Sequence, residues 1–389
     1  MSARKGERAL DPRWVGLGCA CLIASSVLDN LRGPLLPLMS ARFSLDYARA
    51  AAFMGAGTAG SLAVNAAAPR LLERRGERTF LLLCAGLLLA SFVLAGAAGG
   101  VGLLLTAGAL WGGGVSGLGM ASNLLVVRGS AERVRARAVS ALHLLYGFVS
   151  VLPALYLAAA HGAGWGWERT LLAPAGLAAA LLAAVWRWTP RGSARGAPAL
   201  GTGPERRRSI VPAAGLALYV VGEVLTSMWM PSYLHWRGWS LEAASKVLGG
   251  FFLALGLSRL ILAALGGRPP GRGFRAACLL AAIACLALGM SAAPWALAAV
   301  GFCLGPVFPS SVASLSLSHP ERIQRILSLV YVLFTLGLAL GHPLLGLAAD
   351  HLSMQAAYAL PGVFLAGSLV LLALPEEDAG ALEISEQAC

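Results

Sequence analysis

The sequence predicts an all-α integral membrane protein with twelve transmembrane helices in two pseudo-symmetric six-helix bundles. Three observations lead to this fold class. The chain of 389 residues is 58% hydrophobic and 12% charged, with a mean hydropathy of +0.73. A water-soluble chain could not bury that much apolar surface, so lipid is the expected solvent. The apolar residues also fall into twelve long runs, and the two halves of the chain repeat each other.

The twelve apolar runs each have close to the roughly 20 residues that a helix needs to cross a bilayer. Helices are expected because an unbroken apolar run in lipid has to satisfy its backbone hydrogen bonds internally. The predicted spans are 14–37, 47–68, 79–99, 101–127, 138–160, 167–188, 211–235, 243–266, 274–292, 294–317, 325–348 and 354–374.

The basic residues predict the orientation. With both termini in the cytoplasm, 23 of the 30 Lys and Arg residues fall in cytoplasmic segments and five fall outside, while Arg32 and Arg259 lie within spans. Positively charged loops face the cytoplasm. Arg outnumbers Lys 28 to 2, which suggests a GC-rich bacterial genome and hence a bacterial cytoplasmic (inner) membrane. Because the arginines lie in short loops, the net charge of +12 reflects topology rather than a nucleic-acid partner.

One long polar connection divides the chain. Residues 191–210 are rich in Gly, Pro and Arg, which predicts a flexible cytoplasmic linker. The linker separates an N-terminal bundle (1–190) from a C-terminal bundle (211–375). The last segment, 376–389, is acidic and is expected to be a cytoplasmic tail.

Matched residues relate the two halves. Asp29 lies eight residues before Pro37, and Glu223 lies eight residues before Pro231. An offset of about 190 residues also relates Glu132 to Glu321, Gly147 to Gly337 and Pro153 to Pro343. Both prolines of the last pair are expected to bend their spans. A parallel repeat of six helices is typical of transporters that rock two bundles about a site near the midplane.

Two acids inside spans are the predicted proton-coupling residues. A charge in a span is costly, by roughly 2.5–3.5 kcal/mol on insertion scales, so it usually faces a wet cavity or a partner. Asp29 is expected to be either a protonatable coupling group or a substrate ligand. The alternative is a structural pair with Arg32, one turn away, which would keep Asp29 ionised and fixed. Glu223 has no basic residue one turn away and is expected to be unpaired. Burial would then favour its protonated form and make it the better proton carrier, unless it only hydrogen-bonds a neighbouring helix.

The loop after the second span, Pro69 to Arg78, resembles the G-x-x-x-D-R-x-G-x-R motif of the major facilitator superfamily. Arg74, Gly76 and Arg78 match, and Glu73 replaces Asp. The resemblance implies a cytoplasmic gate in which Glu73 bridges to a basic residue or a helix end. The alternative is an ordinary positively charged loop.

Further motifs are similar to those of the fucose-permease-like sugar:proton symporters. They are Asn123 in the fourth span, Leu142-His143-x-x-Tyr146-Gly147 in the fifth, Tyr219-x-x-Gly222-Glu223-x5-Trp229-x3-Tyr233-Leu234 in the seventh, and Gly305-Pro306-x-Phe308-Pro309 in the tenth. That family carries two further acids where this chain has Gly33 and Gly119, which departs from the family's pattern of proton coupling.

The resemblance implies a secondary active transporter that takes up a small hydroxylated solute, such as a sugar, with protons. The expected substrate-binding residues are Asn30, Arg32, Asn123, His143, Tyr146, Tyr219 and Trp229. Amides pair with hydroxyl groups, and an indole covers the apolar face of a sugar ring. Each of these residues alone is also typical of helix packing, and His143 could instead relay protons. The alternative function is proton-driven efflux of a drug or secondary metabolite.

No enzyme, cofactor or metal site is predicted. The sequence has no HExxH, GxSxG or acidic metal cluster, and its seven cysteines lie without metal-ligand spacing. The expected partners are a small-molecule substrate, protons and the lipid bilayer, and the protein is expected to be a monomer.

Overall fold

The computed structural model describes residues 9–189, 210–266, 269–318 and 323–373. Apart from residue 210, the predicted linker (191–210) lies outside this part of the chain, as does the predicted acidic tail (376–389). Within it the protein is almost entirely helical, and the only strand-like pairing of the described residues is one bridge between Leu10 and Ser130.

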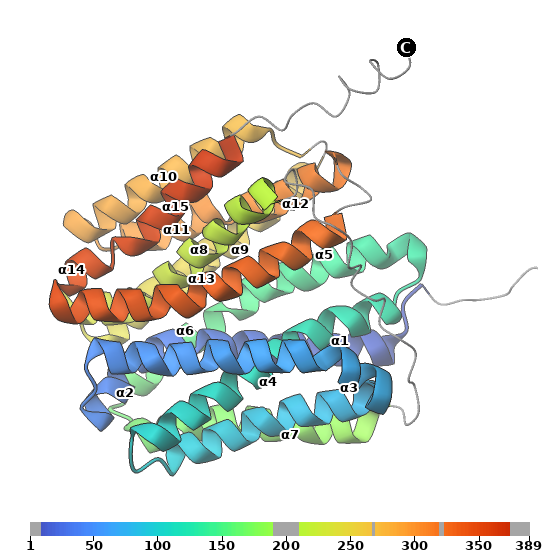
Figure 1. The fold of residues 1–389 in the computed structure, drawn as a ribbon, viewed down its shortest axis with the longest axis horizontal. Coiled ribbons are helices and arrows are strands. Elements are labelled where there is room, and N and C mark those ends of the chain that lie inside the picture. Colours follow the sequence, from blue (N-terminus) through green and yellow to red (C-terminus); the bar gives the residue numbers. More distant parts are fainter. Residues whose placement is uncertain (1–8, 190–209, 267–268, 319–322, 374–389) are drawn as a thin grey trace, which may run out of the picture.

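The helices form two bundles, coloured blue to green and yellow-green to red in Figure 1. The first bundle contains α1 (Pro12–Asn30), α2 (Arg32–Phe43), α3 (Tyr47–Gly96), α4 (Val101–Arg128), α5 (Glu132–Val149), α6 (Val151–Gly162) and α7 (Trp167–Trp188). The second contains α8 (Ile210–Trp236), α9 (Leu241–Leu265), α10 (Arg272–Ser291), α11 (Ala296–Leu304), α12 (Val307–Ser318), α13 (Ile323–His351), α14 (Met354–Ala357) and α15 (Leu360–Ala373).

The described helices account for the twelve predicted spans. Ten helical stretches are long and apolar enough to cross a membrane, and the bent pair α1 and α2 makes eleven. One of the ten, α3, is 50 residues long and consists of two helices that meet at Gly76, whose φ of 76° is left-handed. The chain reverses there (Figure 1), so α3 supplies two spans. The predicted fold class is confirmed.

Prolines explain the breaks inside two spans. The break between α1 and α2 falls at Leu31, three residues before Pro34, and the two axes differ by 42°. The break between α5 and α6 falls at Ser150, three residues before Pro153. A proline removes one backbone hydrogen bond and its ring clashes with the preceding turn. The helix of the fifth span is thus interrupted three residues before Pro153, whereas α13 continues through Pro343.

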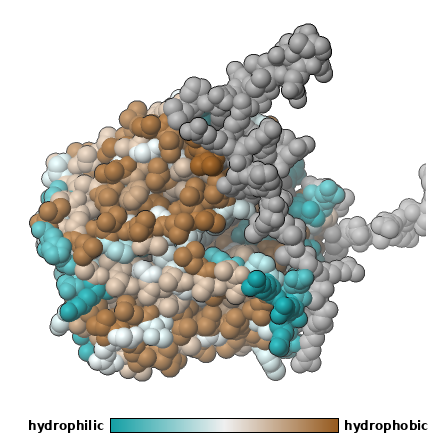
Figure 2. Space-filling model, in the orientation of Figure 1, coloured by the Kyte–Doolittle hydropathy of each residue, from teal (hydrophilic) through white to brown (hydrophobic). Residues whose placement is uncertain are grey.

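The end of the molecule at which α3 reverses carries Arg70, Arg74, Arg75 and Arg78, and we call it the basic face. At the basic face, on the right in Figure 1, Glu77 pairs with Arg128 at 2.5 Å, at the ends of α3's reversal and of α4. At the opposite face, Arg42 at the end of α2 pairs with Glu168 at the start of α7 at 2.9 Å. Between them, Figure 2 shows a broad apolar surface bounded by hydrophilic residues. A surface of this kind fits a lipid surround.

Buried aromatic side chains tie helices together within each bundle. Trp111 of α4 donates its indole N–H to the Leu28 carbonyl of α1 at 2.9 Å. Tyr358 stacks on Tyr233 of α8, with ring centroids 4.3 Å apart, and donates to the Thr226 carbonyl at 2.8 Å. In lipid, packing and hydrogen bonds of this kind replace the hydrophobic effect as the force between helices.

Candidate functional site

An ion pair lies at the break between α1 and α2. Arg32, the first residue of α2, pairs with the Asp29 carboxylate three residues earlier, and its Nε lies 3.4 Å from the Asp29 carbonyl oxygen. The side chains of Asp29 and Arg32 keep 27% and 13% of their surface exposed, although both lie within a span. The structure thus contains the predicted pair, and one edge of the carboxylate stays open.

Asn30 joins this break to α5 and α6. Its Nδ2 donates to the Ser26 carbonyl at 2.9 Å and to Ser150 Oγ at 3.0 Å, and it lies 3.3 Å from the Tyr146 hydroxyl. The Ser26 and Ser150 hydroxyls bond each other at 2.9 Å. The amide nitrogen therefore has more acceptors around it than protons to donate. The Asn30 carbonyl oxygen, by contrast, has no partner among the described residues.

A second ion pair lies between α8 and α9. Arg259 Nη2 is 3.6 Å from Glu223 Oε2, and Arg259 Nε donates to the Gly305 carbonyl at 3.2 Å, where α11 gives way to α12. The expectation that Glu223 is unpaired is therefore wrong, because its partner comes from another helix. The sequence did contain a signal for this pair: Arg259 lies inside an apolar span, where an unpaired cation is costly.

Tyr219, one turn before Glu223 on α8, hydrogen-bonds the Glu223 carboxyl group and, at 2.9 Å, the Leu304 carbonyl. A phenol has one proton, and a carbonyl can only accept. While Tyr219 donates to Leu304, its bond with Glu223 requires that Glu223 is protonated and donates. An ionised Glu223 can only accept, so Tyr219 has to donate its hydrogen bond to Glu223 instead, and the Leu304 carbonyl then loses its bond from Tyr219. The arrangement distinguishes the two protonation states of Glu223.

Tyr146 of α5 lies where the bundles meet. Asn30 bonds its hydroxyl, and the next residue, Gly147, meets Gly256 of α9, one turn before Arg259. Asp29 belongs to the first bundle, and Glu223 and Arg259 belong to the second. The structure thereby brings six predicted site residues together: Asp29, Asn30, Arg32, Tyr146, Tyr219 and Glu223.

Trp229 is enclosed by packing instead. Its side chain is 0% exposed, and its indole N–H donates to Nδ1 of His342 on α13 at 3.0 Å. The expectation that Trp229 covers a sugar ring is wrong for this conformation, because no face of the indole is free. The sequence analysis did not single out His342, which is buried and has to keep Nδ1 unprotonated to accept this bond. A histidine within an apolar span was the available signal.

The two remaining predicted substrate residues lie on α4 and α5. Asn123 Nδ2 donates to the Gly119 carbonyl of its own helix at 3.1 Å, and no described contact links Asn123 to the cluster around Tyr146. His143 belongs to α5, but the placement of its side chain lies outside what the structure describes.

The two glycines at the family's acid positions differ in how much room a side chain would have. A Cβ atom at Gly33 would lie 2.7 Å from the Met228 carbonyl oxygen and 2.8 Å from its Cα. Here α2 and α8, which belong to different bundles, meet backbone to backbone, so no side chain fits. A Cβ at Gly119 would meet nothing within 4 Å. An acid is thus sterically excluded at Gly33 and merely absent at Gly119.

In the loop at the basic face that resembles the family's motif, the ion pair is formed by a different acid from the one expected. Glu73 and Arg74 are exposed, and neither side chain forms a hydrogen bond or an ion pair with a described residue. Glu77, 7% exposed, pairs instead with Arg128 of α4, and Arg78 donates to the Trp186 carbonyl at 2.8 Å. The expectation that Glu73 forms the bridge is wrong for this state. Glu73 precedes the turn on an exposed surface, whereas Glu77 follows the turn and reaches α4.

At the opposite face, Asp350 of α13 holds the bundles together. Its carboxylate accepts hydrogen bonds from the backbone N–H groups of Tyr47 at 3.0 Å and Ala48 at 2.7 Å, in the first turn of α3. These N–H groups have no partner within their helix, and the helix N-terminus carries partial positive charge. One turn earlier, a Cβ at Gly346 would lie 2.6 Å from the Tyr47 carbonyl oxygen.

The bundles also touch near the middle of the molecule. A Cβ at Gly147 of α5 would lie 3.0 Å from Gly256 Cα of α9, so the two backbones meet directly. By contrast, α4 packs on α1, α3 and α5, and α12 packs on α8, α10, α11 and α13, each within its own bundle. The close contacts between bundles described above therefore lie at the opposite face and the middle.

Comparison with known proteins gives one family and a set of similar folds. The sequence model of the Major Facilitator Superfamily matches residues 18–324. No curated protein matches the chain.

Among solved structures, a D-xylose–proton symporter is similar with a TM-score of 0.71 and 14% identity, over 94% of this chain and 98% of that one. The nucleoside transporter NupG gives 0.71 and 14%, over 92% and 98%. The fucose:proton symporter FucP of E. coli gives 0.62 and 15%, over 92% and 97%. At these identities the likeness is one of fold.

Proposed function

The chain belongs to the Major Facilitator Superfamily and is a membrane transporter rather than an enzyme, and from this we propose that it couples uptake of a small hydroxylated solute, such as a sugar, to proton entry. Alternating access of a site between the two bundles would move both. The observation that carries the proposal is an acid–arginine pair within the spans of each bundle, beside the contact between α5 and α9. Asn30 links the first pair to Tyr146 of α5, and Arg259 follows Gly256 of α9 by one turn.

The hydrogen-bonding groups of the first bundle support a hydroxylated solute. The Asn30 carbonyl oxygen lacks a partner among the described residues, and one edge of Asp29 stays exposed. Both groups accept hydrogen bonds, which is what a sugar hydroxyl donates. Each acid is paired with an arginine, so the site as a whole has little net charge, which favours an uncharged solute. The sugar symporters with the same fold agree with this class of substrate.

The geometry of Glu223 supports proton coupling. Ionised Glu223 pairs with Arg259 and accepts the hydrogen bond of the Tyr219 hydroxyl. Protonated Glu223 has no charge for Arg259 and itself donates to Tyr219, which is then free to donate to the Leu304 carbonyl. Proton binding thus changes contacts between α8 and α9 and between α8 and α11 without displacing a backbone. A coupling group has to interact differently with its surroundings in its two protonation states, and Glu223 meets that condition.

The orientation follows from charge. Placing the basic face in the cytoplasm of a bacterial inner membrane obeys the positive-inside rule. The state described here is then closed toward the outside by Asp350 and Gly346. In this proposal a single chain is the working unit, because both bundles that form the site belong to it.

Uptake by the purified protein in proteoliposomes tests the proposal. An imposed proton gradient, acid outside, should drive accumulation of one member of a panel of labelled sugars and nucleosides. Collapse of the gradient with a protonophore should reduce this accumulation to equilibration. Accumulation in the absence of any proton gradient, or outward transport only, would rule out proton-coupled uptake.

A further inference from the structure

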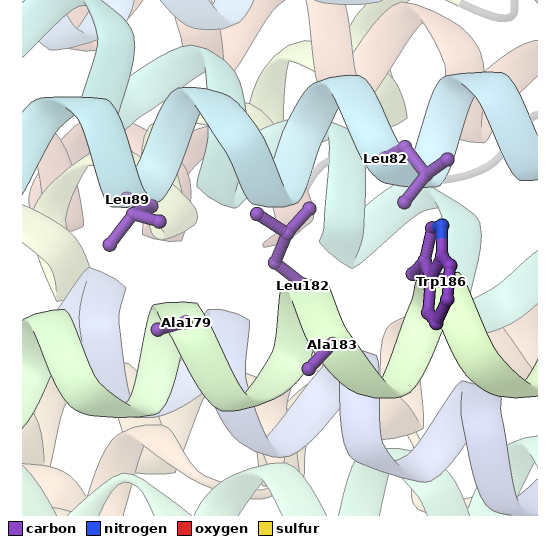
Figure 3. A pocket seen from close by; sticks show the side chains of 6 residues that line it. All are labelled: Leu82, Leu89, Ala179, Leu182, Ala183 and Trp186. Atoms are coloured by element: carbon purple, nitrogen blue, oxygen red, sulfur yellow. The ribbon is translucent and has the colours of Figure 1, made fainter.

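An apolar groove lies on the outer surface of the first bundle and shares no residue with the cluster around Tyr146. It has a volume of about 400 Å³ and is lined by Leu82, Leu89, Ala179, Leu182, Ala183 and Trp186. The first two belong to the part of α3 that follows Gly76, and the others belong to α7. Figure 3 shows the leucines of α3 facing Leu182 and the Trp186 ring, which stands between the two helices.

The groove has the shape of a short channel that fits a hydrocarbon chain. Leu82 and Leu89 are seven residues apart, as are Ala179 and Trp186, which at 1.5 Å per residue gives about 10 Å along each helix. It runs from the membrane interior toward the basic face, and the two alanines keep the α7 side shallow. Apart from the indole N–H of Trp186 at one end, a polar solute would find no hydrogen-bonding partner in the groove, so hydrocarbon is the fitting content.

The end of the groove at the basic face has donors and positive charge. Arg78 lies one turn before Leu82 and uses Nη2 to bond the Trp186 carbonyl at 2.8 Å, which fixes it beside the groove. Arg187 is exposed, and no described residue pairs with its side chain. Trp186 is 60% exposed, and its indole N–H has no acceptor among the described residues. The nearest acid in sequence, Glu77, is already paired with Arg128.

We propose that this groove binds one acyl chain of an anionic phospholipid from the leaflet at the basic face. The phosphate lies against Arg78 and Arg187, and an ester carbonyl of the lipid accepts the Trp186 N–H. Arginines pair strongly with phosphate, and basic pockets on the cytoplasmic side of helix bundles attract anionic headgroups. A lipid with a choline headgroup would fill the apolar part equally well but would bring its own cation to the two arginines.

Fluorescence quenching of Trp186 tests the preference for anionic lipid. The full chain is reconstituted in phosphatidylcholine vesicles that contain brominated phosphatidylglycerol or, at the same mole fraction, brominated phosphatidylcholine. The chain has ten tryptophans, so the Trp186 signal is the difference between the parent and Trp186→Phe. Brominated phosphatidylglycerol should occupy the site about fivefold more strongly for each arginine engaged. Arg187→Gln should reduce this preference, whereas Arg169→Gln, at the other end of α7, should leave it unchanged.

A second pair of variants tests the groove itself. Ala183→Leu fills it, whereas Ala180→Leu adds the same bulk to an exposed position on α7 that does not line it. Native mass spectrometry of the intact protein should show a retained phosphatidylglycerol in the parent and in Ala180→Leu, and its loss in Ala183→Leu. Equal quenching by the two brominated lipids, or retention of the lipid in a folded Ala183→Leu protein, would overturn the proposal.

Discussion

Asp350 of α13 accepts a hydrogen bond from the backbone N–H of Ala48 at 2.7 Å, across the boundary between the two bundles. In the proposed alternating-access cycle, this contact has to break whenever the opposite face opens. A carboxylate at a helix N-terminus contributes about 1 kcal/mol. Asp350→Asn should therefore raise the population open at that face about fivefold. Distances between spin labels at residues 44 and 352, in a background without the native cysteines, would measure it.

Asp46 supplies the control for this variant. It caps the same helix, accepting from the Arg49 N–H at 2.7 Å, but it belongs to the same bundle as α3. Asp46→Asn should lower stability without shifting the distance distribution. A similar shift in both variants would mean that the end of α3 matters and the contact between bundles does not.

Glu223→Gln should separate solute binding from proton coupling. The amide cannot carry the proton, yet it keeps a polar group of nearly the same size beside Tyr219. Exchange of labelled for unlabelled solute should persist, while accumulation driven by a proton gradient should disappear. Glu242→Gln is the matched control, since Glu242 lies in the same bundle and pairs with Lys246 in solvent. Full accumulation by Glu223→Gln would make Glu223 a structural residue.

Asp29→Asn should instead weaken solute binding. It removes a partner of Arg32 and an exposed acceptor at the site, while the Glu223–Arg259 pair in the second bundle stays intact. We expect a several-fold rise in KM for uptake, or a loss of stability caused by the unpaired Arg32. Unchanged KM together with unchanged thermal stability would contradict this role.

Arg259→Gln should destabilise the protein by up to about 3 kcal/mol, because it leaves Glu223 as a largely buried charge without its partner. The double variant Arg259→Gln/Glu223→Gln removes both charges and should recover more than half of that loss. Thermal unfolding of the four proteins in one detergent forms a double-mutant cycle. Additive effects of the two substitutions would show that the pair at 3.6 Å has no energetic role.

Gly33→Ala and Gly119→Ala form a pair with opposite expectations. The added methyl at Gly33 would collide with the Met228 backbone, whereas at Gly119 it would meet open space. Gly33→Ala should therefore reduce uptake at least tenfold, because the halves can no longer close as described. Gly119→Ala should stay within about twofold of the parent. Initial uptake rates, normalised to protein in the membrane, decide between these outcomes.

How far the sequence predicted the structure depends on the range of each interaction. The twelve spans were predictable because lipid demands long apolar helices whatever their neighbours are. The Asp29–Arg32 pair was predictable because only three residues of sequence separate the two side chains. Both predictions rest on local or solvent-imposed rules.

The partners of Glu223 and Trp229 could not be predicted in the same way. Arg259 and His342 reach them from other helices, and nothing in the apolar periodicity of α9 or α13 sets how those helices are rotated or shifted against α8. The sequence analysis did not single out Asp350, because its role depends on where the other bundle places the start of α3.

The meeting of Gly147 with Gly256 bears on how fast the protein can work. Interdigitated side chains would have to separate before one bundle could rotate against the other, and this would raise the activation barrier for the rotation. At Gly147 and Gly256 no side chain stands between the helices, because a Cβ at Gly147 would already lie 3.0 Å from Gly256 Cα. The two backbones can therefore slide past each other without disengaging side chains. Evolution could therefore tune turnover at this spot, by adding or removing single methyl groups, without altering what the transporter recognises.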